Sequence, residues 1–216
     1  MIDIVSLLDE IKNAPYKEIT LSTPHSGHIE FVVRQAGVKV TGFTGEWNEK
    51  PGTLLAYLTR EGNKKPIHAP EKGEVVMFHD INDHQFVQAG APLLKIRHFL
   101  TKQEVIDIIL KKALHLFNAP EKGKYYFVSA IDIKLKARGL GHVNIKQGDE
   151  VLIISRMKRE TILTYEGPAG IIYTVYFNSN ESVEAGVPLL GICPKNQVEK
   201  IKDVVNKIQM GWEEKE

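Results

Sequence analysis

The sequence predicts a mainly β protein, built from two similar consecutive β domains with three helical segments around them. The first observation behind this is an internal repeat. VQAGAPLLKI at 87–96 and VEAGVPLLGI at 183–192 agree at seven of ten positions, 96 residues apart. The second observation is that proline and glycine recur at regular intervals between short apolar stretches. The third is that only three segments have helical periodicity. Similar segments at a fixed offset are typical of repeated structural units.

The same offset extends over most of both halves. It relates three further pairs of turn residues: Pro24 and Pro120, Gly27 and Gly123, Gly52 and Gly148. An offset that holds over this length indicates a tandem duplication, with β domains at 18–98 and 118–194.

Each half alternates short apolar stretches with turn residues. P-x-x-G occurs at 24–27, 70–73 and 120–123, and GPAG at 167–170 is a shortened form of it. Stretches such as EVVMF at 74–78 and IIYTVYF at 171–177 follow these turns. Short strands bounded by glycine and proline at regular spacing predict an all-β sandwich or barrel.

The first helix is predicted within residues 1–17. Val5, Leu8 and Ile11 fall on roughly one face of a helix, and Pro15 provides a stop. This segment precedes the first β domain.

Two more helices are predicted at 99–117 and 195–216. Thr101 followed by Glu104 has the spacing of a capping box, and an apolar face follows it. We expect this helix to join the two β domains. The last segment begins after Pro194 and is amphipathic.

The composition excludes several classes of protein. With 28 Lys and Arg against 27 Asp and Glu, the net charge of +1 gives no reason to expect nucleic acid as a partner. Cys193 is the only cysteine, so no intramolecular disulfide can form. No apolar run reaches the roughly 20 residues that cross a bilayer, and the N-terminus lacks the pattern of a secretory signal. We therefore expect a cytoplasmic protein with no membrane insertion.

No catalytic or metal-binding motif stands out. The stretch HDINDH at 79–84 has two histidines and two aspartates, but their spacing fits no standard ligand pattern. We expect a polar loop there, and neither a metal site nor catalytic residues in this chain.

The sharpest local feature is a predicted hairpin in the second half. VLII at 151–154 reads as a strand and a second apolar run begins at Thr161, so the residues between them form the tip. Lys158 then lies at an exposed turn, directly after Met157. A lysine that accepts a prosthetic group must enter the active site of the modifying enzyme, and an exposed turn allows this.

Four motifs around this hairpin resemble those of the biotinyl/lipoyl attachment domains, and of biotin carboxyl carrier domains in particular. They are a Gly-Asp-x-Val turn (Gly148, Asp149, Val151), a Met-Lys hairpin (Met157, Lys158), an approximate P-x-x-G turn (Pro168, Gly170) and a closing strand (Val183, Gly186, Leu189, Ile192). The resemblance is close over 142–193 and less specific over 20–96.

This resemblance implies a fold and a function. Each half would be a barrel-sandwich, and Lys158 would carry covalent biotin, flanked by Met157, Arg156 and Arg159 as recognition residues. The protein would be a biotin carboxyl carrier subunit of a multi-subunit carboxylase or decarboxylase. Its partners would be a biotin protein ligase and separate biotin carboxylase, carboxyltransferase or decarboxylase subunits.

The sequence departs from the family at the tip and in the first half. Arg156 and Arg159 replace the alanine and methionine that usually flank the Met-Lys pair, and Gly62 stands at the position equivalent to Lys158. The first domain is therefore a degenerate copy without an acceptor. The alternative is an unmodified scaffold or assembly protein whose basic tip docks a partner. Lipoyl acceptors have Asp-Lys-Ala-like flanks, which this tip lacks.

Overall fold

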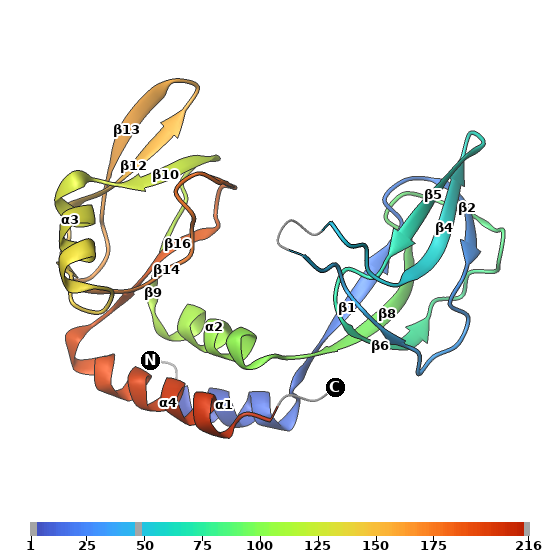
Figure 1. Ribbon diagram of the computed structural model, residues 1–216, viewed down its shortest axis with the longest axis horizontal. Helices are drawn as coiled ribbons and strands as arrows, with labels where there is room; N and C mark the ends of the chain where they lie inside the picture. Colours follow the sequence, from blue (N-terminus) through green and yellow to red (C-terminus); the bar gives the residue numbers. More distant parts are fainter. Residues whose placement is uncertain (1–3, 46–48, 214–216) are drawn as a thin grey trace. The chain divides into compact units, whose positions relative to one another are not determined.

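The computed structural model describes residues 4–45 and 49–213 (Figure 1). The chain divides into two compact units. Residues 11–101 form what we call the first unit, and residues 102–212 together with 4–10 form the second unit.

The first unit contains two four-stranded antiparallel sheets. Its strands are β1 (Tyr16–Ser22), β2 (Gly27–Phe31), β3 (Lys39–Val40), β4 (Leu54–Arg60), β5 (Asn63–His68), β6 (Gly73–Phe78), β7 (Phe86–Val87) and β8 (Pro92–Phe99). The strand orders are β1-β8-β6-β3 and β5-β4-β2-β7.

The second unit also contains two four-stranded antiparallel sheets. Its strands are β9 (His115–Asn118), β10 (Gly123–Phe127), β11 (Asn144–Ile145), β12 (Glu150–Arg156), β13 (Arg159–Thr164), β14 (Gly170–Val175), β15 (Ser182–Val183) and β16 (Pro188–Cys193). The strand orders are β9-β16-β14-β11 and β13-β12-β10-β15, so the topology of the first unit recurs strand for strand. The prediction of a mainly β protein is confirmed.

Each unit has its hydrophobic core between its two sheets. In the first unit, the fully buried Ile29 of β2 belongs to the same cluster as Val75 of β6 in the other sheet. In the second unit, Tyr125 of β10 and Ile172 of β14 are related in the same way. Because one cluster takes side chains from both sheets, each unit is a two-sheet sandwich.

Two of the turn glycines, Gly73 in PEKG and Gly170 in the shortened GPAG, are required for more than the turn itself. A Cβ at Gly170 would lie 2.6 Å from the carbonyl oxygen of Cys193 in the neighbouring β16, and a Cβ at Gly73 would meet the carbonyl oxygen of Arg97 in β8. Neither glycine has a positive φ. These positions therefore need glycine because a neighbouring strand approaches closely.

The helices differ from the predicted segments at their ends. They are α1 (Ile4–Asn13), α2 (Lys102–Ala113), α3 (Ser129–Arg138), the short 3-10 helix η1 (Lys195–Gln197) and α4 (Val198–Gly211). The helix expected over 99–117 is shorter at both ends, because Phe99 pairs with Tyr16 in the β1–β8 ladder and His115 pairs with Ile192 in the β9–β16 ladder. Sheet pairing thus decides where α2 stops. The last three residues of the predicted 195–216 helix lie outside the described residues.

Helix α3 was not predicted from the sequence. It lies between β10 and β11, in a part of the second half for which we expected only strands and turns. Ile131 is its one fully buried side chain, whereas Ile133 is 66% exposed. Gly139, with φ of 78°, follows its last residue. The first unit has no helix between β2 and β3.

The helices α2 and α4 of the second unit pack against each other. Val105 and Ile109 of α2 and Ile201 and Ile208 of α4 are buried, and the ammonium of Lys102 donates to the carbonyl oxygen of Gln209 at 2.9 Å. Within residues 4–45 and 49–213, no helix combines the length and the apolar character needed to cross a membrane.

Candidate prosthetic-group attachment site

The hairpin of β12 and β13 ends in a two-residue turn made of Met157 and Lys158. Arg156 and Arg159 are the last cross-strand pair before it. Met157 has φ of 46° and Lys158 has φ of 63°. A type I′ turn requires positive φ at both central residues, and its twist matches that of the flanking strands. The sequence placed Lys158 at a hairpin tip, and this is where the structure has it.

The two turn residues are open to solvent. Met157 is 86% exposed, although it is a large apolar side chain, and Lys158 is exposed as well. Among the described residues, the ammonium of Lys158 has no hydrogen bond or ion pair. A reacting group could therefore approach Nζ of Lys158 without first displacing a partner.

The two arginines beside the turn differ in their surroundings. Arg156 forms an ion pair with Glu121, which lies in the turn between β9 and β10. Arg159 is exposed, with no ion pair in the described part of the chain. The tip is therefore less basic than its sequence suggests, because one of its cations is neutralised.

Tyr125 fixes the turn that supplies Glu121. Its side chain is fully buried, and its hydroxyl donates to the backbone carbonyl oxygen of Glu121. Burial is the main cause that raises the pKa of Tyr125 above its ordinary value. The Tyr125 hydroxyl therefore helps to position Glu121, which pairs with Arg156. No motif in the sequence indicated this role for Tyr125.

A hollow of about 650 Å³ lies beside the tip. Ile154 and Leu163, from the two strands of the hairpin, give it apolar walls, and Met157 and the Arg156–Glu121 pair border it. Apolar surface bordered by a few charged groups is typical of a place where an organic group rests on a protein.

The turn residues carry backbone strain that a glycine would relieve. Replacing Lys158 with glycine is expected to raise the free energy of unfolding by about 0.5–1 kcal/mol, since a side chain in the left-handed region costs more than the chain entropy of glycine. Lys158→Ala keeps the strained Cβ and should give no such gain. Urea unfolding of both variants measures the difference, and equal gains would contradict the assignment of strain.

The first unit has the same turn but no lysine in it. Glu61 has φ of 52° and Gly62 has φ of 76°, between the paired Arg60 and Asn63. Lys64 lies beyond the turn and is occupied, because its ammonium is 2.6 Å from the carboxylate of Glu30. The turn geometry is therefore shared by both units, whereas a lysine at the second turn position is found in one.

The other residues considered in the sequence, in the 79–84 loop and at Cys193, have contacts that stabilise the fold. Asp83 accepts hydrogen bonds from the backbone N–H of Phe31 at 2.8 Å and from Arg34 at 2.7 Å, which fixes the 79–84 loop. Within 4–45 and 49–213, no group of three or more His, Cys, Asp and Glu side chains is placed to hold a metal ion. Cys193 is fully buried, and burial raises the pKa of its thiol.

Comparison with known proteins gives matches among solved structures alone. No family model matches the sequence, and no curated protein is significantly similar to it. Solved structures do match. One is a single-chain, multi-domain long-chain acyl-CoA carboxylase, at 12% identity over 80% of this chain and 23% of that one, with a TM-score of 0.31. Another is the urea carboxylase of Kluyveromyces lactis, at 13% identity over 86% of this chain and 23% of that one, with a TM-score of 0.28.

This chain thus spans about a quarter of the length of either carboxylase. TM-scores this low do not show a shared overall fold. The activities of those two enzymes therefore do not extend to this chain.

Proposed function

We propose that this protein is a biotin carboxyl carrier subunit and that Lys158 is its biotin acceptor. The observation that carries the proposal is the exposed ammonium of Lys158, unpaired among the described residues, at the second position of a two-residue turn. The family motifs around the hairpin agree with this position.

The residues at the tip fit an attached biotin. The Nζ of Lys158, after losing a proton, would attack the biotin carboxyl group that the ligase has activated with ATP, and AMP would leave as the amide bond forms. Among the described residues, nothing competes for Nζ. The bound cofactor supplies the chemistry, since its ring system accepts and releases a carboxyl group. The protein contributes a fixed point of attachment, because β12 and β13 remain paired up to Arg156 and Arg159.

The proposal assigns different roles to the two units. The second unit carries biotin, and the first unit, with Gly62 at the equivalent turn position, is a scaffold. The recurrence of strand order between the units supports an origin by tandem duplication. Biotin carboxylase and carboxyltransferase or decarboxylase activities would belong to partner subunits in the cytoplasm, and a biotin protein ligase would load Lys158.

Intact-mass analysis tests the acceptor. The full chain, incubated with a biotin protein ligase, ATP and biotin, is expected to gain one biotin, and Lys158→Ala is expected to gain none. Lys65→Ala is the matched control, because Lys65 is also exposed but lies in β5 beyond the first unit's turn. It should be labelled like the unchanged chain.

Two results would overturn the proposal. An unlabelled chain, in a reaction that labels a known carrier, would favour the alternative of an unmodified scaffold with a docking tip. Labelling that persists in Lys158→Ala would place the acceptor elsewhere. A parallel reaction with a lipoate ligase and lipoate should leave the chain unmodified.

A further inference from the structure

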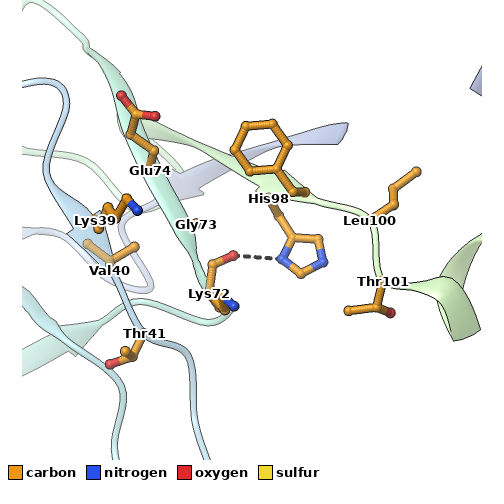
Figure 2. A pocket seen from close by; sticks show the side chains of 10 residues that line it. Lys39, Val40, Thr41, Lys72, Gly73, Glu74, His98, Leu100 and Thr101 are labelled. Atoms are coloured by element: carbon orange, nitrogen blue, oxygen red, sulfur yellow. Dashed lines mark hydrogen bonds between the residues drawn. The ribbon is translucent and has the colours of Figure 1, made fainter. Parts of the chain in front are cut away.

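A cavity of about 340 Å³ lies within the first unit, where three strands of one sheet come together (Figure 2). It is lined by β3 and the residue after it, by Lys72 and the first two residues of β6, and by the end of β8 with the two residues that follow. Cavities of about 300 Å³ and more are large enough for a small ligand. The proposed carrier function makes no use of this cavity.

His98 is the most deeply buried polar group in the lining. Its side chain is only 5% exposed, and Nδ1 lies 2.6 Å from the carbonyl oxygen of Lys72. Because a carbonyl can only accept, Nδ1 carries the proton and the ring is held in one orientation. Figure 2 shows the ring between Lys72 and the segment of Leu100 and Thr101.

The charges around the cavity are mainly positive. Lys39 and Lys72 are exposed, and among the described residues neither ammonium has an ion pair. Among the described residues of the lining, Glu74 has the one carboxylate. It points away from His98 in Figure 2, and a Cβ at Gly37 would lie 3.8 Å from its Oε1. Glu74 is also the cross-strand partner of Lys39, so two lysines stand against one glutamate and the described lining keeps a net positive charge.

One part of the lining is apolar, whereas Thr41 and Thr101 add hydroxyl groups. Val40 is 3% exposed and Leu100 is 5% exposed, and Phe99 adds an aromatic ring. Cations together with an apolar wall match a ligand that has an anionic head and a short hydrocarbon part. An inorganic anion would leave the apolar wall unused.

The corresponding place in the second unit has different chemistry. The hollow between β11, β14 and the end of β16 is lined by Asp149 as well as by Lys146 and Lys195. Pro194 stands 96 residues after His98, so no imidazole is present there. The cationic, imidazole-containing cavity is thus a property of the first unit and not of the repeated fold.

We propose that this cavity binds a short-chain carboxylic acid. The carboxylate lies against the ammonium groups of Lys39 and Lys72, and the hydrocarbon part lies toward Val40 and Leu100. His98 closes the polar side of the cavity. Charge-assisted hydrogen bonds to the two lysines give the acid its advantage over a neutral analogue of the same shape.

Titration of the full Lys158→Ala chain with butanoate, followed by NMR of backbone amides, tests the site without the acceptor. We expect saturable shifts confined to β3, the beginning of β6 and the end of β8. Butanamide, which is neutral, and inorganic phosphate, which has no hydrocarbon part, are expected to bind at least about tenfold more weakly.

The lysines are tested with matched pairs of substitutions. Lys39→Gln with Lys72→Gln should weaken butanoate binding by about tenfold or more. Lys146→Gln with Lys195→Gln, at the corresponding place of the second unit, should leave the affinity unchanged. Equal binding of butanamide, equal effects of the two lysine pairs, or no shifts near His98 would each overturn the proposal.

Discussion

Moving the acceptor to the first unit is expected to restore biotin labelling to a chain that has lost Lys158. The variant combines Glu61→Met and Gly62→Lys with Lys158→Ala. Both turns have positive φ at their two central residues, and an arginine precedes each of them. If a ligase reads mainly the turn and its Met-Lys pair, Lys at position 62 should be labelled. Intact mass and peptide mapping would locate the biotin.

The control for this experiment is Glu61→Met with Lys158→Ala, which has a lysine at neither turn and should remain unlabelled. Asn63 follows the transferred pair, where the second unit has Arg159. An unlabelled transfer variant, alongside full labelling of the unchanged chain, would contradict the prediction. It would show that the ligase requires contacts outside the turn, and adding Asn63→Arg would then test Arg159 as one of them.

Leu190→Ala is expected to lower the free energy of unfolding of the second unit by about 2–5 kcal/mol. Leu190 lies in β16, is fully buried and belongs to the cluster between the two sheets. Leu94→Ala is the matched change in the first unit, because Leu94 occupies the same place in β8 and is also fully buried. Both substitutions remove the same atoms and leave a cavity that neighbouring strands can close only in part.

Native-state hydrogen exchange can assign each loss to its unit. Leu190→Ala should reduce the protection of amides in β10, β12 and β14, and Leu94→Ala should do so in β2, β4 and β6. Equal loss of protection in both units after either substitution would contradict the division of the core into two separate clusters.

The β architecture was predictable because its signals are local and repeated. The strands of each unit lie between turn residues such as Pro120 and Gly123, and the 96-residue offset marks most of their counterparts. The pair β3 and β11 departs from this offset, since helix α3 precedes β11. Helix α3 was not predictable in this way, because Ile131 is its only fully buried residue and its apolar residues form no clear face. Strand β9 was missed because HLFN at 115–118 continues an apolar helical pattern, and only pairing with β16 makes it a strand.

At the site, the sequence indicated where Lys158 lies but not how it is held. Methionine and lysine both avoid the left-handed region, so sequence preference alone would argue against a turn with positive φ at both residues. The flanking strands impose this geometry. The ion pair of Arg156 with Glu121 was also beyond the sequence, because it joins residues 35 positions apart that only the sheet brings together.

The two-residue turn has a consequence for how far an attached group can travel. A tip with paired residues on both sides has no slack loop, so the backbone at Lys158 cannot swing out from the hairpin. The radius that a cofactor on Nζ can sweep is then set by the lysine side chain and by the cofactor's own arm. If Lys158 carries biotin as proposed, transfer between catalytic centres farther apart than this radius would require the whole second unit to move.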